Sequence, residues 1–272
     1  MNQNISLGQY FPGNSLVHRI DPRTKIIVSL SYMAVVLAAG SPLEFALLAA
    51  FAACAVAASG VPASMVLRSV KPIIPLIVFA GAINVFFAKG RPIFRLWVIA
   101  PTYEGCALAL MMSARISLIL IGGSAMMIFT TTPILLTDGV ERLLKPLKRL
   151  RVPVHELAMM MTIALRFIPT LMEEADKIIK AQASRGADFN EGKLLDRARS
   201  FIPIIIPLFV SAFRRADELA NAMEARCYRG DEGRTRMREL RMTRLDAMAF
   251  AAFGLCAALF ALLKLGRAWW GA

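Results

Sequence analysis

The chain has 272 residues, 57% of them hydrophobic, and a mean hydropathy of +0.57. Ordinary soluble domains are less apolar, so the composition excludes a typical soluble protein and indicates one that lies in a bilayer. The net charge of +13 at pH 7 would suit a nucleic-acid partner, but acidic residues are interleaved with the basic ones and no nucleic-acid motif occurs, so attraction to anionic lipid headgroups is the simpler explanation.

Five membrane-spanning helices are predicted from stretches that are nearly free of charge. The segment 26–58 contains one charged residue, Glu44, and Gly40-Ser41-Pro42 interrupts it. We therefore interpret it as two spans, each near the lower limit of about 17–25 residues for crossing the hydrocarbon. The other spans are expected at 72–88, 103–129 and 247–263. The fold class that follows is all-α and polytopic.

The distribution of lysine and arginine predicts which side of the membrane each loop faces. Arg19, Arg23 and Lys25 precede the first span, and most of the other basic residues fall in 130–244. The positive-inside rule places the N-terminus and this region in the cytoplasm and the C-terminus outside, although the basic residues of 89–95 would then face outward. No cleaved signal peptide is expected, because the first apolar run begins only after Lys25.

Amphipathic helices are predicted in the cytoplasmic insert 130–244. Apolar residues recur at three- and four-residue steps over 157–179 and again over 205–223, which is the period of a helix with one apolar face. A kink is expected at Pro169. Exposed apolar surface of this extent is rare, so these faces should be buried against each other, the spans or a partner.

Three parts are therefore expected along the chain. Residues 1–129 hold the N-terminal tail and the first four spans, 130–244 form the cytoplasmic coupling-helix region, and 245–272 hold the last span and the C-terminal tail. Within the middle part, a polar turn is expected at 188–192 and a shorter amphipathic helix at 134–150, lying along the inner leaflet.

Two stretches of the insert share one frame. ADKIIKAQASRG begins at Ala175 and ADELANAMEARC begins at Ala216, so matching residues are 41 apart. The frames end in the triplets Ser184-Arg185-Gly186 and Ala225-Arg226-Cys227. An arginine between small residues can place its five donors on a carboxylate or on several carbonyls of a partner. Alternatively, a basic residue at a helix C-terminus offsets the helix dipole and Gly186 is a C-cap, but the dipole requires no repeated frame.

Together with GQYFPGNSLVHRIDPRTK before the first span, the triplets resemble the transmembrane (T) component of energy-coupling factor transporters, and the length and N-terminal motif look most like the shared-module type. The resemblance implies a prokaryotic cell-membrane importer of the ABC type for vitamins or metals. In that family two coupling helices cross in an X and each docks into one of two cytoplasmic ABC ATPase subunits, while a membrane S component binds the substrate. Arg185 and Arg226 would be the main transmitting contacts.

One residue departs from the family pattern, because Cys227 stands where the family usually has glycine. Cysteine is poorly suited to a left-handed helix cap, so the second helix is expected to continue toward Gly230 and to end there. Ser184 in place of alanine is a milder change. The contact of Arg226 is accordingly expected to be the looser of the two.

The N-terminal motif Asp21-Pro22-Arg23-Thr24-Lys25 also matches the family. Its residues suggest a helix start, with Asp21 as the cap, Pro22 in the first position, and Arg23 and Lys25 anchored at the lipid headgroups. We expect a structural motif without a direct functional role.

No chemistry of its own is expected of the chain. It lacks a G-x-x-x-x-G-K-[ST] loop and a nucleophile-base constellation, so we predict that it is not an enzyme and that ATP is hydrolysed by partner subunits. Neither the cysteines nor the two histidines have the spacing of a metal site, and no cofactor is expected. Arg115, inside the fourth predicted span, should either mark a functional site or pair with Glu104 or with helix-end carbonyls.

Two other functions remain possible on sequence grounds. The chain could be the permease of an ordinary ABC importer, although one coupling helix would then suffice, or a non-transport membrane scaffold or enzyme whose basic insert rests on lipid. The expected partners of the favoured function are two ATPase subunits, an S component and membrane lipid, with no nucleic acid.

Overall fold

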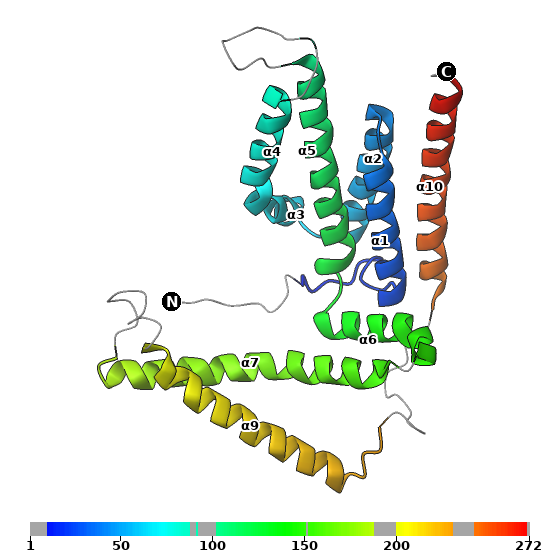
Figure 1. Cartoon of the computed structure of the whole chain (residues 1–272). Helices are drawn as coiled ribbons and strands as arrows, with labels where there is room; N and C mark the ends of the chain where they lie inside the picture. Colours follow the sequence, from blue (N-terminus) through cyan, green and yellow to red (C-terminus); the bar gives the residue numbers. More distant parts are fainter. Residues whose placement is uncertain are drawn as a thin grey trace. The chain divides into compact units, whose positions relative to one another are not determined.

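The structure is a computed structural model that describes residues 10–87, 91, 102–150, 152–187, 200–230 and 242–270. The regular elements in these ranges are all helices, which confirms the predicted all-α class. The chain forms two compact units (Figure 1). We call Met1–Leu143 with Glu239–Ala272 the bundle unit and Leu144–Arg238 the insert unit.

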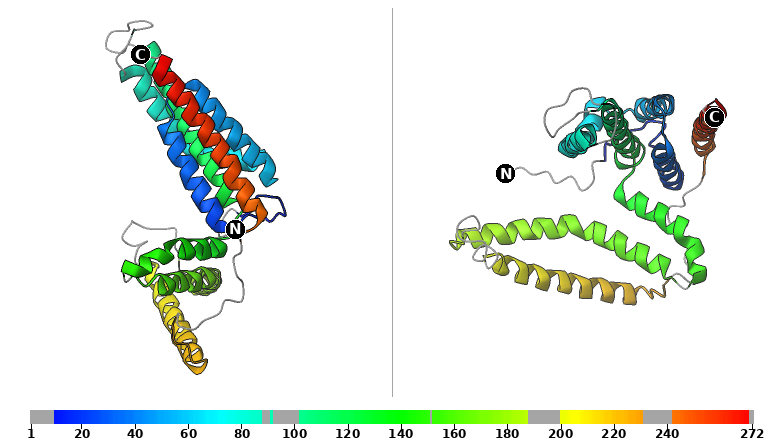
Figure 2. Two further views of the ribbon diagram at one scale, coloured as in Figure 1. Left: turned by 90° about the vertical axis from the view of Figure 1, so that its right-hand side faces the viewer. Right: turned by 45° about the horizontal axis from the view of Figure 1, so that its top comes forward.

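The bundle unit is built around long helices that lie side by side, in which α1 and α2 each contact both α5 and α10 (Figure 2). Its α-helices in chain order are α1 (Pro22–Ala38), α2 (Pro42–Ser59), α3 (Ala63–Val70), α4 (Ile74–Phe87), α5 (Tyr103–Gly123), α6 (Pro133–Leu144) and α10 (Arg244–Trp270). A 3-10 turn, η1 (Lys71–Ile73), joins α3 to α4, and a π-helical turn, η2 (Ser124–Ile128), extends α5.

Local sequence signals explain where the first helices begin and end. Asp21 is the N-cap of α1, and Pro22, which has no N–H to satisfy, occupies the first turn. At α2, Ser41 and Glu44 form a capping box, and Gly60 ends the helix with a left-handed φ of 66°. The predicted break between the first two helices is therefore confirmed.

Apolar packing holds the middle of the bundle unit. Tyr32 of α1 and Leu48 of α2 are fully buried there, and the Tyr32 Oη donates to the Leu48 carbonyl at 3.3 Å. A Cβ at Gly122 of α5 would collide with the Tyr32 ring, so only glycine lets α5 lie this close to α1.

Five described helices are long and apolar enough to cross a membrane, which agrees with the predicted number. These are Pro42–Ser59, Ala63–Phe87, Tyr103–Ile128, Val154–Ser184 and Arg244–Arg267. The membership differs from the prediction in two places. Helix α1, predicted as the first span, is not among them, because its 17 residues are one fewer than the 18 of α2, the shortest helix that qualifies. Helix α7, predicted to be cytoplasmic, qualifies by its 31-residue length and its composition.

The insert unit contains two long helices, α7 (Val154–Ser184) and α9 (Ile202–Ala225), preceded by the 3-10 helix η3 (Lys145–Leu150). They run antiparallel, since Arg215 of α9 pairs with Glu174 of α7 at 3.7 Å while Tyr228 after α9 donates to the Met159 sulfur at 3.0 Å. Both predicted amphipathic helices are thus present, and Pro169 lies inside α7. The polar turn predicted at 188–192 lies outside the described residues.

The apolar face of α9 is not covered within the insert unit. Phe209 and Phe213 are 60% and 67% exposed, whereas Leu171 and Ile178 of α7 are half-buried. Of the predicted alternatives, burial of the two faces against each other therefore does not extend to Phe209 and Phe213. Burial of this face against the spans or a partner stays a prediction.

Candidate functional site

The two arginines singled out by the sequence occupy equivalent positions at helix ends. Helix α7 ends at Ser184 and α9 ends at Ala225, so Arg185 and Arg226 are the respective C-cap residues. Their backbone angles are nearly the same, with φ of −88° and −92°. Both side chains are exposed, and neither forms an ion pair with a described residue. Each guanidinium is thus available to an outside partner.

The hydrogen bonds around the two arginines also match one for one. After α7, the amide of Gly186 donates to Ala183 at 3.0 Å and that of Ala187 donates to Gln182 at 3.0 Å. After α9, the amides of the two corresponding residues donate to the carbonyls two and three positions before the cap in the same way. Their bonds are Cys227 to Glu224 at 2.9 Å and Tyr228 to Met223 at 3.0 Å. This pattern is the Schellman motif, which satisfies the last free carbonyls of a helix.

Cys227 corrects one prediction. The second helix does not continue toward Gly230, but ends at the same place in the frame as the first, with Cys227 in the left-handed region at φ 55°. Among the described residues it is the one non-glycine with a positive φ. The two bonds of the Schellman motif hold it there against an unfavourable backbone energy of about 1–2 kcal/mol.

The N-terminal motif lies within the bundle unit and is more than a helix start. Asp21 caps α1 as predicted, accepting from the Arg23 amide at 2.9 Å. The prediction that Lys25 reaches lipid headgroups is wrong, since its side chain is 4% exposed. Its ammonium donates to the Thr130 carbonyl at 2.9 Å and to the Thr131 hydroxyl at 3.0 Å. Burial of a charged group requires such partners, and the protein supplies them here.

Asp246, in the first turn of α10, completes this cluster and was not identified from the sequence as a site residue. Its carboxylate accepts from the backbone amide of Asp21 at 2.8 Å and from the amide and hydroxyl of Thr243 at 2.6 and 2.9 Å. The side chain is 1% exposed. The available signal was a lone acidic residue at the start of an apolar span, where a carboxylate can cap the helix.

Arg115 contacts a helix end, which is one of the predicted alternatives. Its guanidinium donates to the carbonyl of Ala39, the C-cap of α1, at 2.6 Å and lies 5.7 Å from the centre of the Phe45 ring. No ion pair joins Arg115 to Glu104 among the described residues, and the Glu104 carboxylate accepts from the Arg91 amide at 2.8 Å.

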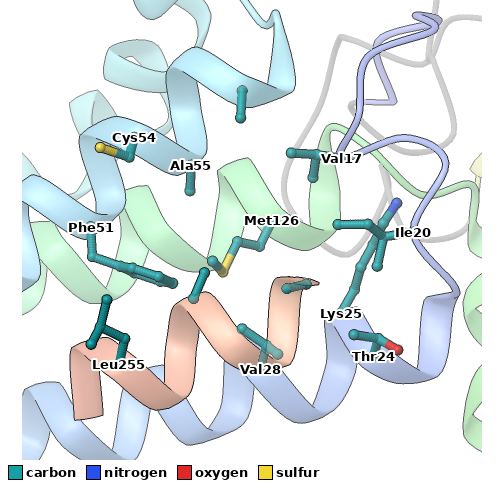
Figure 3. A pocket seen from close by; sticks show the side chains of 13 residues that line it. Val17, Ile20, Thr24, Lys25, Val28, Phe51, Cys54, Ala55, Met126 and Leu255 are labelled. Atoms are coloured by element: carbon teal, nitrogen blue, oxygen red, sulfur yellow. The ribbon is translucent and has the colours of Figure 1, made fainter. Parts of the chain in front are cut away.

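A cavity of about 400 Å³ lies between α1, α2, η2 and α10 (Figure 3). Its walls are mostly apolar, with Phe51, Met126 and Leu255 among them, and Thr24 and Lys25 lie on the α1 side. The Lys25 ammonium is already bonded to Thr130 and Thr131. Recognition of a polar vitamin needs several convergent polar groups, which these walls do not offer. No group of metal-ligating side chains occurs within the described ranges.

Comparison with known proteins gives matches over nearly the whole chain. A family model described as cobalt transport protein (CbiQ) matches residues 13–237. The energy-coupling factor transporter transmembrane protein EcfT of Ruminiclostridium cellulolyticum is 56% identical over 248 residues, covering 91% of this chain and 92% of that one. Proteins of the same name from Acidaminococcus fermentans and Bacillus subtilis are 53% and 45% identical over 272 and 266 residues. They cover 100% and 97% of this chain, and 99% and 100% of their own lengths.

Proposed function

The chain belongs to the family of energy-coupling factor transporter transmembrane proteins, and from this premise we propose that it couples two cytoplasmic ABC ATPase subunits to a substrate-binding membrane S component. In this function the chain transmits motion driven by ATP hydrolysis and hydrolyses no ATP itself. We assign the coupling to the region 130–244, with the N-terminus and this region in the cytoplasm of a prokaryotic cell.

The observation that carries this proposal is the pair of matched helix ends. Arg185 and Arg226 share backbone angles, capping hydrogen bonds and exposure, although their helices differ in sequence. A helix dipole can be offset by any nearby cation, so it does not account for the same spacing and the same capping bonds around each arginine. Two like ends, each offering a planar guanidinium, suit two like partners with carboxylate or carbonyl acceptors.

The alternatives are less well supported. An ordinary ABC permease would carry the substrate through its own spans and would need one coupling helix. The cavity of the bundle unit is mostly apolar, and Arg115 is engaged by a helix end, so neither gives a polar path. A scaffold resting on lipid would explain the basic charge but not the paired caps.

Alanine variants of the two arginines test the proposal in the assembled complex. Loss of a partly buried hydrogen bond to a charged group is of order 1.5–3 kcal/mol, so Arg185→Ala and Arg226→Ala should each weaken ATPase association by about 10- to 150-fold. The double variant should abolish uptake while still inserting into the membrane. Co-purification of the ATPases and uptake in the same cells are the measurements.

Two exposed cations close to the caps provide matched controls, Lys180→Ala for the first site and Arg229→Ala for the second. If general basicity attracts the ATPases, the controls will weaken association as much as the cap variants do. Near-normal association and uptake in the double variant would refute coupling through these arginines.

A further inference from the structure

The insert unit is joined to the bundle unit by two chain segments, 130–143 on the way out and 239–246 on the way back. Whatever moves the insert unit must act on the bundle unit through these segments or through contacts between the units. Where the structure describes them, both segments contact the same short stretch of the bundle unit. This stretch is the first turn of α1, with its motif Asp21 to Lys25.

The outgoing segment is held by Lys25. Its ammonium donates to the Thr130 carbonyl at 2.9 Å and to the Thr131 hydroxyl at 3.0 Å, directly after η2. All three residues are buried, at 4%, 3% and 6% exposure. A buried, charge-assisted hydrogen bond to a carbonyl is short and directional, so it fixes the position of the segment more firmly than apolar contact does.

A second contact holds the same segment further along, in α6. Gly139 lies so close to α1 that an added Cβ would be 3.0 Å from the Pro22 Cβ and 3.2 Å from the Ile26 Cδ1. These distances are tighter than ordinary van der Waals contact. The absence of a side chain at Gly139 therefore lets α6 pack directly on the first turn of α1.

The returning segment is held by Asp246. One carboxylate oxygen accepts from the Asp21 amide at 2.8 Å, and the other accepts from the Thr243 amide at 2.6 Å and its hydroxyl at 2.9 Å. Asp246 therefore joins the start of α10 to the start of α1. The Asp21 carboxylate is meanwhile used within α1, as the cap of the Arg23 amide.

From this convergence we infer that the first turn of α1 is a clamp that holds both connecting segments and passes movement of the insert unit to α1 and α10. The inference rests on the proposed function, because it supplies the path by which that function would reach the spans. Lys25, Gly139 and Asp246 are its positioning residues. They touch neither substrate nor nucleotide, and they act by keeping the two connections in register.

The test uses the complete complex, with both ATPases and the S component, reconstituted in liposomes. Lys25→Met removes the charged hydrogen bonds at similar length, and Gly139→Ala disturbs the same place without touching a charge. Both variants should retain the ATPases and hydrolyse ATP at rates within about twofold of the unchanged complex. Uptake per ATP hydrolysed should fall at least about tenfold, measured with riboflavin, folate, thiamine or biotin according to the S component present.

Lys264→Met is the matched control. Lys264 lies on α10 and, like Lys25, donates to a backbone carbonyl, that of Ala38, but at 3.4 Å and in an exposed position away from the first turn of α1. Its uptake per ATP should stay within about twofold of the unchanged complex.

The outcomes separate the inference from the function on which it rests. If the unchanged chain retains no ATPases, the proposed function itself fails. If assembly is normal and Lys25→Met and Gly139→Ala leave uptake per ATP unchanged, the clamp alone is refuted. Absence of both variants from the membrane would also refute it, because the contacts would then only stabilise the fold.

Discussion

Replacing Cys227 with glycine should stabilise the end of α9. The residue is held at φ 55° by the Schellman motif, and a side chain in the left-handed region costs about 1–2 kcal/mol that glycine does not. Glycine gives back about 0.4–1 kcal/mol because it makes the unfolded chain more flexible. The middle of each range gives a net gain of about 0.8 kcal/mol, which corresponds to a roughly fourfold smaller opening constant for this helix end.

Amide hydrogen exchange of the chain in detergent measures this opening directly. The amides of Cys227 and Tyr228 donate the two capping bonds, so their exchange, normalised to the intrinsic rates, should slow by about fourfold in Cys227→Gly. Gly186→Cys is the reciprocal variant. Because nothing lies within 4 Å of a Cβ at Gly186, its φ of 88° is the main penalty, and exchange after α7 should speed up. Unchanged or faster exchange in Cys227→Gly would show that the cap is not strained.

Two further substitutions and one binding measurement have expected outcomes. Gly122→Ala should lower the stability of the bundle unit by about 1–3 kcal/mol, because its Cβ meets the buried Tyr32 ring. Gly123→Ala should leave the stability unchanged, because nothing lies within 4 Å of a Cβ at Gly123. Thermal unfolding of the two variants checks both expectations. Arg115→Met should cost about 1.5–3 kcal/mol through the lost bond to Ala39, and an unchanged melting temperature would contradict it. The purified chain should bind riboflavin, folate, biotin and thiamine no more tightly than millimolar, and calorimetry that finds a micromolar site would favour the permease alternative.

The positions of the helices could be predicted well from the sequence. The burial of individual side chains and their tertiary partners could not. Hydropathy and capping signals located the break before α2 because both are local properties. Lys25 was assigned to the lipid surface because a cation beside a span usually lies there, and its acceptors, Thr130 and Thr131, are more than a hundred residues away in the chain. Cys227 was misjudged for a different reason. Residue propensity opposed the cap, but the hydrogen bonds of the helix end outweighed it.

The lengths of α1 and α2 explain why the charged residues Arg115 and Glu44 occur within the spans of the bundle unit. Helices α1 and α2 have 17 and 18 residues, about 25–27 Å, so their connection falls short of the roughly 30 Å of hydrocarbon. The last carbonyls of α1 and the first amides of α2 have no helical partner there, and an unsatisfied backbone group in lipid costs several kcal/mol. Arg115 donates to the Ala39 carbonyl, and Glu44 accepts from the Gly40 and Ser41 amides at 2.7 and 3.3 Å. These charged side chains therefore satisfy a short helical hairpin, which accounts for their presence without a path for cargo.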